Sequence, residues 1–94
     1  MSGYPATSLQ DLTIKPDVIA RTVADEMILL DLESGTYFTL NAVGTFVWRG
    51  LERGASLDVL VEEVTDEFTI DAETAATDVA AFLESVLAAG LITT

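Results

Sequence analysis

Residues 35–48 read GTYFTLNAVGTFVW and decide the fold of this chain. The segment from Thr36 to Leu40 is rich in aromatic and β-branched residues, which favours a β-strand. After Asn41 the hydrophobic residues recur at the 3.6-residue period of a helix, so we expect a helix from Ala42 to about Glu52 with Asn41 as its N-cap. The stretch therefore predicts a strand that leads directly into a helix. The expected apolar stripe of this helix consists of Val43, Phe46, Val47 and Leu51.

Upstream of this stretch the sequence predicts two more strands. Val18 to Val23 alternates as a strand does, and Met27 to Leu32 is an apolar run of strand length. The connection Glu33-Ser34-Gly35 ends in glycine, as many β-hairpin loops do. We therefore expect a three-stranded antiparallel sheet built from residues 18–23, 27–32 and 36–40.

Downstream the sequence predicts two further helices. Ser56 and Asp71 are N-cap residues, and each is followed by an acidic residue in the first helical turn. Gly50 and Gly54 are expected to mark the end of the first helix and the following loop, and Gly90 the end of the third. The apolar stripes are Leu57, Leu60, Val61, Val64 and Phe68 in the second helix and Ala75, Val79, Phe82, Leu83, Val86 and Leu87 in the third.

The predicted order of elements is β-β-β-α-α-α. It indicates an α+β domain, a three-stranded antiparallel sheet followed by three helices, which resembles a winged helix-turn-helix. Leu91-Ile92 is expected to add a short final strand. Residues 1–13 mix Gly, Pro, Ser and Thr without a sustained period, so we expect a flexible N-terminal tail there and one folded domain over residues 14–94.

The composition argues against catalysis. The chain has no cysteine and no histidine, and therefore lacks thiolate nucleophiles, thiolate zinc ligands and the commonest general base. The acidic pairs Glu62/Glu63 and Asp66/Glu67 fall on the outer face of an amphipathic helix, where carboxylates are ordinarily solvated. We therefore expect no enzyme activity, no metal site and no cofactor.

Charge is the strongest global property of the sequence. Sixteen Asp and Glu residues against four Lys and Arg residues give a formal net charge of -12. Such a surface repels nucleic acid and anionic membranes, and residues 71–89 hold four acidic residues and no basic one. The charge therefore argues against binding to nucleic acid or to a membrane and favours neutral or basic partners.

The sequence gives no sign of export. We find no basic segment followed by an apolar run near the N-terminus, and no apolar run of membrane-spanning length. Because there is no cysteine to form disulfides, the reducing cytoplasm is the expected compartment.

Residues 35–48 resemble the signature of the pyrroloquinoline-quinone biosynthesis protein D (PqqD) family, in which a strand ends in Leu-Asn and a helix carries Gly-x-x-[Ile/Val]-Trp. Here these positions are Leu40-Asn41 and Gly44 to Trp48. Further segments match the family in order, and the resemblance covers about residues 14–92. These segments are Lys15-Pro16-Asp17-Val18, Leu29 to Gly35, Asp78 to Leu83, and Gly90-Leu91-Ile92.

The resemblance implies a RiPP recognition element, where RiPP denotes a ribosomally synthesised and post-translationally modified peptide. Such domains bind the leader of a precursor peptide as an added strand against their third strand, beside their last helix. The Gly-x-Tyr-Phe-x-Leu-Asn motif of residues 35–41 is most similar to the leader-binding subunits of lasso-peptide pathways. The resemblance implies a transglutaminase-like leader peptidase and a cyclase as partners. The family further implies a Tyr and a Pro in the leader as anchors.

Two alternatives remain open. The first is a PqqD protein proper, which would act as peptide chaperone for a radical SAM enzyme in pyrroloquinoline quinone biosynthesis. The second is a non-catalytic winged-helix protein-interaction module of another kind. An open sheet edge can also pair with its own copy, so a homodimer through the sheet edge is a further expectation.

The expected site is the open edge of the third strand, which can accept a peptide by β-augmentation. Ordering a peptide residue costs about 1–2 kcal/mol, whereas a backbone hydrogen bond returns about 1 kcal/mol. Binding therefore also needs side chains that enter two or more apolar pockets, at about 1.5–3 kcal/mol each. The candidate peptide-binding residues are Tyr37, Phe38 and Thr39 on the strand and Ala75, Asp78, Val79 and Phe82 on the last helix.

Some of these residues have a second interpretation. Val79 and Phe82 also fit the core, and Leu40 is expected to be a core residue. Asp78 sits beside the apolar stripe, where it either accepts a hydrogen bond from the leader, attracts a basic residue or is simply solvated. Trp48 is interpreted as a packing residue.

Overall fold

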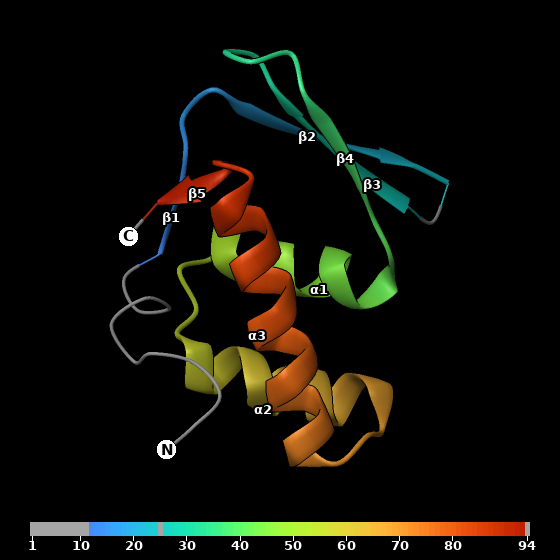
Figure 1. Cartoon of the computed structure of the whole chain (residues 1–94). Helices are drawn as coiled ribbons and strands as arrows, with labels where there is room; N and C mark the ends of the chain where they lie inside the picture. Colours follow the sequence, from blue (N-terminus) through green and yellow to red (C-terminus); the bar gives the residue numbers. More distant parts are fainter. Residues whose placement is uncertain (1–11, 25, 94) are drawn as a thin grey trace.

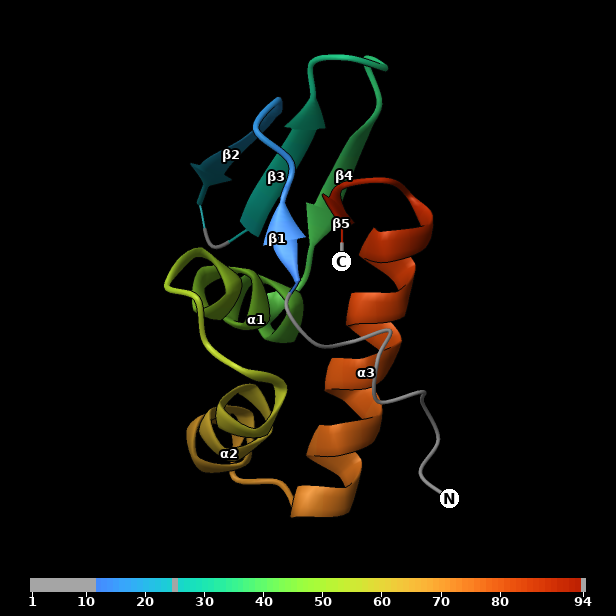
Figure 2. The same ribbon diagram turned by 90° about the vertical axis from the view of Figure 1, so that its left-hand side faces the viewer.

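The computed structural model describes residues 12–24 and 26–93 and confirms the α+β architecture (Figure 1). The strands β2 (Val18–Val23), β3 (Glu26–Asp31) and β4 (Tyr37–Leu40) form an antiparallel sheet in the order β2-β3-β4. The helices are α1 (Ala42–Glu52), α2 (Leu57–Phe68) and α3 (Ala72–Ala88). Two short strands, β1 (Thr13–Ile14) and β5 (Ile92–Thr93), pair antiparallel with each other (Figure 2).

The three-stranded sheet turns one face toward the helices. On this inner face, Met27 and Leu29 of β3 and Leu40 of β4 are 4% exposed or less. Because successive residues of a strand point to opposite faces, Ile28 and Leu30 project from the outer face. Figure 1 shows the three helices on the inner side of the sheet, so the described helices leave the outer face uncovered.

The helices and the inner face of the sheet enclose one apolar core. Trp48 of α1, Leu60 of α2 and Leu83 of α3 are each exposed by 1% or less. The interpretation of Trp48 as a packing residue is therefore confirmed. The other buried apolar residues are Met27, Leu29, Leu40, Val47, Leu51, Val64, Ala75, Val79, Ala80, Val86, Leu91 and Ile92.

Each helix begins at the N-cap that the sequence predicts. The Asn41 side chain accepts a hydrogen bond from the Gly44 N–H at 2.8 Å, and Ser56 caps α2 in the same way. The Asp71 carboxylate accepts one from the Thr74 N–H at 2.7 Å, and this bond holds the pKa of Asp71 below its ordinary value. Local hydrogen bonding thus fixes where α1 follows β4.

The β3–β4 hairpin is organised by Asp31, whose side chain is 5% exposed. Its carboxylate accepts hydrogen bonds from the Glu33 N–H at 3.0 Å and the Ser34 hydroxyl at 3.1 Å. These bonds, the Glu33 bond first, lower the pKa of Asp31, and the Lys15 ammonium at 3.6 Å acts in the same direction. Gly35 has a φ of 77°, a conformation that favours glycine. The turn therefore sets the start and the register of β4.

The role of Gly50 differs from the expectation. Gly50 does not end α1 but lies buried inside it, and a Cβ atom there would collide with the Leu60 side chain of α2. The residue is needed because the two helices approach closely at this point. Gly54, with a φ of 79°, follows in the loop as expected.

The N-terminal side of the domain is tied to its C-terminal end. Leu12 and Ile14 pack against the core, and the Lys15 N–H donates a hydrogen bond to the Leu91 carbonyl at 3.1 Å. The expected flexible tail, residues 1–13, falls mostly outside the described residues, but Thr13 belongs to β1. The sequence therefore predicted β5 but not its partner strand.

Candidate functional site

Strand β4 has an open edge, because among the described strands it pairs only with β3. The Asp31 N–H donates a hydrogen bond to the carbonyl of the residue that precedes β4, and the register continues from there. Hydrogen-bonded pairs alternate along an antiparallel ladder, so Phe38 and Leu40 direct their backbone groups at β3. Tyr37 and Thr39 consequently direct their N–H and C=O groups at the open edge, where a further strand can pair with them.

The opposite edge of the sheet, on β2, has a charged side chain against it. The Arg49 guanidinium of α1 lies 3.5 Å from the Thr22 hydroxyl of β2. A charged side chain at a sheet edge is one of the devices by which proteins discourage further strand pairing. The β4 edge is therefore the better candidate for accepting a peptide.

A cleft of about 390 Å³ lies between the start of α1 and the middle of α3. Asp78 and Phe82 line it from α3, and Asn41 and Gly44 line it from the junction between β4 and α1. A Cβ atom at Gly44 would lie 3.0 Å from Cε1 of Phe82, so the missing side chain lets the Phe82 ring lie close against α1 at this cleft. Because Asn41 directly follows β4 and lines the cleft, the open edge of β4 runs toward the cleft.

The candidate residues of α3 divide into two groups. Phe82 is half-buried and Asp78 is exposed, and both line the cleft. Ala75 and Val79 are 0% exposed, because their side of the helix packs on the core. Their side chains support the cleft from behind rather than offer a surface, so the candidate surface on α3 is reduced to Asp78 and Phe82.

The candidate residues of β4 lie on opposite faces of the sheet. Tyr37, which is 69% exposed, and Thr39 project from the outer face, whereas Phe38 is half-buried and packs on the core from the inner face. A strand added at this edge would alternate in the same way. Its side chains would therefore lie beside Tyr37 and Thr39 on one face and toward Phe38 and the helices on the other.

Some residues of the cleft were not expected from the sequence. Ala81 and Ser85 stand three and seven residues after Asp78, so they share one helical face with it, next to the core stripe. This second stripe is the pattern in the sequence from which the α3 residues of the cleft could have been predicted. Its small residues leave room around Phe82. The unexpected cleft residues are Asn41, Val43, Gly44, Ala81 and Ser85.

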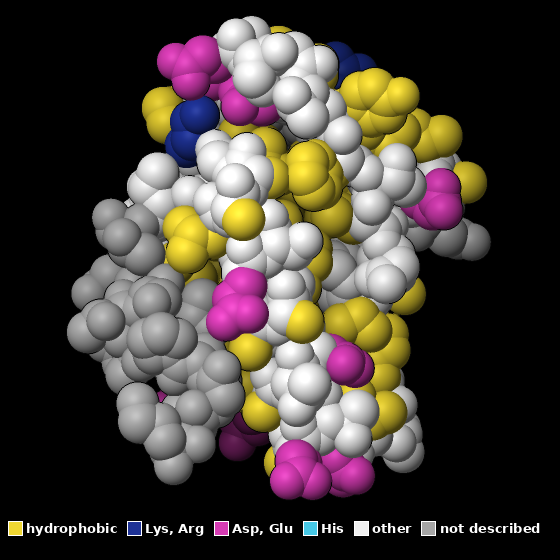
Figure 3. Space-filling model, in the orientation of Figure 1, with side chains coloured by type: hydrophobic (Ala, Val, Ile, Leu, Met, Phe, Trp, Pro, Cys, Tyr) yellow, Lys and Arg dark blue, Asp and Glu magenta, His cyan; other side chains and the backbone are white. Residues whose placement is uncertain are grey.

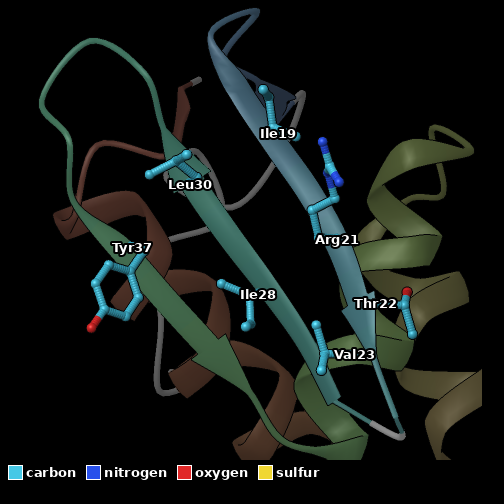
Figure 4. Close-up of a pocket in the computed structure, with 7 residues that line it drawn as sticks. All are labelled: Ile19, Arg21, Thr22, Val23, Ile28, Leu30 and Tyr37. Carbon is cyan, nitrogen blue, oxygen red and sulfur yellow. The ribbon is translucent and has the colours of Figure 1, made fainter.

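A second hollow, of about 500 Å³, lies on the outer face of the sheet (Figure 4). The strand register places Ile19, Leu30 and Tyr37 side by side across the three strands. The next row sets Arg21 beside Ile28. Figure 4 shows these side chains on the face of the sheet that is turned away from the helices.

The surface next to β4 is apolar, and the surface farther along α3 is acidic. Figure 3 shows hydrophobic side chains in the strip between β4 and α3 and acidic side chains over the lower part of α3.

Within residues 12–24 and 26–93, no three His, Cys, Asp or Glu side chains gather as a metal site. None of the helices in that part of the chain is long and apolar enough to cross a membrane.

The sequence matches the family described as coenzyme PQQ synthesis protein D (PqqD) over residues 26–92, from β3 to β5. The chain belongs to the PqqD family. The match includes the β4 edge and every residue that lines the cleft. A search of curated protein sequences gives no match.

Two solved structures share the fold of this PqqD-family chain. The structure of TbiB1 in complex with the TbiA(beta) leader peptide is 34% identical, with a TM-score of 0.80 over 85% of this chain and 93% of that chain. The structure of a lasso peptide synthetase B1 complexed with the leader peptide is 25% identical, with a TM-score of 0.82 over 89% and 99% of the two chains. Both similar proteins were therefore determined with a leader peptide bound.

Proposed function

We propose that this chain binds the leader segment of a ribosomally synthesised precursor peptide by strand addition to β4. It delivers the precursor to a transglutaminase-like leader peptidase and a cyclase in lasso-peptide or related biosynthesis, and performs no catalytic step itself. One observation carries the proposal. The unpaired edge of β4 runs into a cleft beside α3 that holds both the Phe82 ring and the Asp78 carboxylate, in a fold shared with two proteins solved in complex with leader peptides.

The backbone of β4 supplies the register of binding. Tyr37 and Thr39 present two N–H and two C=O groups at the open edge, and each hydrogen bond to a leader strand contributes about 1 kcal/mol. Ordering each leader residue costs about 1–2 kcal/mol, so these bonds alone do not hold the leader. The backbone therefore aligns the leader, and side chains must supply the affinity.

The cleft supplies those side-chain contacts. A leader side chain that points toward the helices meets the half-buried Phe82 ring, which lies against the buried Gly44. Burial of one apolar side chain there contributes about 1.5–3 kcal/mol. Asp78 at the same cleft accepts a hydrogen bond or pairs with a basic leader residue, and the net charge of -12 favours the approach of such a leader.

A titration with a fluorescently labelled leader from the neighbouring precursor gene tests the proposal. The parent chain should bind with a dissociation constant of about 1 μM or tighter, a range typical of specific peptide recognition. Phe82→Ala and Tyr37→Ala should each weaken binding about tenfold, the equivalent of about 1.4 kcal/mol. No binding in the micromolar range by the folded parent chain would contradict the proposal.

Matched controls separate the site from general effects. Val59→Ala removes an apolar side chain of α2 that is 39% exposed and lies outside both hollows, and should leave binding unchanged. Asp78→Asn should reduce affinity for a basic leader, whereas Glu84→Gln, an equal charge change on α3 outside the cleft, should not. Equal effects at site and control positions would show that the cleft residues do not contribute specifically to leader binding.

The family match on its own also fits a second function, as peptide chaperone for a radical SAM enzyme in pyrroloquinoline quinone biosynthesis. The similarity to a lasso peptide synthetase B1, at 25% identity and a TM-score of 0.82, favours the lasso-peptide function. Competition between a lasso leader and a pyrroloquinoline quinone precursor peptide for the labelled complex distinguishes them. Preference for the pyrroloquinoline quinone precursor peptide would assign the chain to that pathway. Binding by strand addition to β4 would still stand.

A further inference from the structure

The proposed leader site has two walls, β4 and α3, that share little direct contact. Helix α3 packs chiefly on α1, α2 and β5, whereas β4 packs on β3 and α1. One end of the site is fixed by α1, because Asn41 joins β4 directly to α1 and Phe82 of α3 lies against Gly44 of α1. At the other end, where β4 begins and α3 ends, the spacing of the two walls must depend on another contact.

The turn that precedes β4 projects from the body of the domain. Every residue from 32 to 37 is exposed, so core packing does not hold this turn in place. The hydrogen bonds within the turn join Asp31 to the residues that follow it. A further bond leaves the turn, from the Leu32 N–H to the Asp17 carbonyl at 2.9 Å. The turn is therefore held from outside by the segment that leads into β2.

Lys15, in that segment, contacts both the end of α3 and the turn before β4. Its N–H donates to the Leu91 carbonyl at 3.1 Å, and Leu91 is fixed to the last turn of α3 because its own N–H donates to the Val86 carbonyl at 3.0 Å. The Lys15 ammonium lies 3.1 Å from Oε1 of Glu33 and 3.6 Å from Oδ2 of Asp31. Lys15 thus joins the end of one wall to the start of the other.

The contact between Lys15 and Asp31 is sheltered from solvent. The two side chains are 23% and 5% exposed, so water and salt screen this pair less than an exposed one. The Glu33 hydrogen bond first, and then the charge of Asp31, raise the pKa of Lys15 against the opposing effect of burial. The ion pair between Arg53 and Glu63 is more exposed and joins the end of α1 to α2, so it provides a reference.

We propose that Lys15 is a positioning residue of the leader site, which sets the spacing between β4 and α3 at the end opposite the cleft. This inference rests on the proposed function, because a leader strand paired with β4 must also contact α3. The role needs no contact between Lys15 and the leader. Lys15 holds the turn in its bound position before the leader arrives, so less conformational freedom is lost on binding.

Leader titration of folded variants tests this role. Lys15→Met removes the ammonium and keeps an apolar stem, and should weaken leader binding about fivefold or more, because the turn is then ordered only on binding. Lys15→Arg should bind the leader within about twofold of the parent chain, since a guanidinium also pairs with carboxylates. Arg53→Met is the matched control, because it removes the reference ion pair, and should also stay within about twofold.

Amide hydrogen exchange in the loaded chain separates positioning from a purely structural role. In Lys15→Met with saturating leader, the Tyr37 N–H next to the turn should exchange faster than in the loaded parent chain. The Thr39 N–H, nearer the cleft, should exchange as in the parent. A residue that serves only the fold would lower the free energy of unfolding, measured by urea denaturation, and would speed exchange at both positions.

Glu33→Gln keeps the inference testable if Lys15→Met does not fold. The Glu33 side chain is 68% exposed and its backbone bond to Asp31 is retained, so this variant removes only the shorter ion pair of Lys15. It should weaken leader binding about threefold, whereas Glu63→Gln, which breaks the Arg53 pair, should leave binding unchanged.

The outcomes separate this inference from the proposed function. Equal leader affinity of Lys15→Met and Arg53→Met, failure of Lys15→Arg to restore binding, or equally accelerated exchange at Tyr37 and Thr39 would each overturn the positioning role. Equal affinity of Glu33→Gln and Glu63→Gln would do the same. In each case leader binding by the parent chain still stands. Absence of leader binding by the folded parent chain would overturn the proposed function and this inference with it.

Discussion

The two faces of the three-stranded sheet are built from the same strands, but only one of them is closed. Leu29 on the inner face is 0% exposed, whereas Val23 on the outer face is 57% exposed. The apolar side chains of the inner face are explained by the core that they help to form. Those of the outer face add little to the core, so the comparison separates residues that close the fold from residues that stay at the surface.

The largest expected effect contrasts neighbouring residues of β3. Leu29→Ala should lower the free energy of unfolding by about 2–5 kcal/mol, because it empties a fully enclosed site. Ile28→Ala, one residue along and on the outer face, should cost about 1 kcal/mol or less. Urea denaturation of both variants measures the difference. Equal losses of unfolding free energy would mean that the outer face is as closely packed as the inner one, and would contradict the distinction between the two faces.

A pair of buried glycines in α1 sharpens the same contrast, because Gly50 lies against the fully buried Leu60 and Gly44 against the half-buried Phe82. Gly50→Ala should lower the free energy of unfolding by about 1–3 kcal/mol, because the new methyl group meets Leu60 in the packed contact between α1 and α2. Gly44→Ala should cost less than about 1 kcal/mol, since alanine favours the helix and the half-buried Phe82 ring, which the new methyl group meets, can shift into the cleft that it lines.

Gly44→Ala should nevertheless reduce leader affinity, because its methyl group displaces the Phe82 ring that lines the cleft. Calorimetric titration of the leader and urea denaturation of the same preparations give both quantities. Unchanged affinity for Gly44→Ala in the folded chain would show that leader side chains do not enter the cleft.

The smallest expected effect is a pH dependence on the closed side of the sheet. The pKa of Asp31 is lowered from its ordinary value of 3.8, so its hydrogen bonds stabilise the folded chain above that pH. The contribution is lost as the pH falls through the folded-state pKa. Asp31→Asn should therefore unfold more easily at neutral pH, and the difference from the parent chain should shrink as the pH approaches 3.

Urea denaturation at several pH values checks this sign, with Glu62→Gln as an exposed control. A difference between Asp31→Asn and the parent chain that stays constant down to low pH would contradict the role of the carboxylate in the β3–β4 turn.

The elements were predictable because their signals are local. Asn41, Ser56 and Asp71 mark helix starts by hydrogen bonds that reach only three residues along the chain. Alternation in Val18–Val23 and the apolar run from Met27 to Leu32 likewise indicated strands without knowledge of what covers them, although the second strand lies one residue earlier, at Glu26–Asp31. The pairing of β1 with β5 was missed because it joins two short segments from opposite ends of the domain.

The site was predictable only in part because it depends on how elements pack. Sequence spacing placed Val79 and Phe82 on one apolar stripe of α3, but the packing of α3 buries Val79 completely and leaves Phe82 at the cleft. The contact between α1 and α2 at Gly50, and the close approach of Phe82 to Gly44, exist only in three dimensions. No local pattern carries that information.

Amide hydrogen exchange along β4, followed by NMR with and without leader peptide, tests the central claim most directly. In the free chain the N–H groups of Phe38 and Leu40 should be protected by β3, and those of Tyr37 and Thr39 should exchange rapidly. Saturating leader should slow exchange at Tyr37 and Thr39 and leave Thr22 on the β2 edge unchanged. Leader binding that protects the β2 edge instead, or that leaves Tyr37 and Thr39 exchanging as in the free chain, would contradict strand addition at β4.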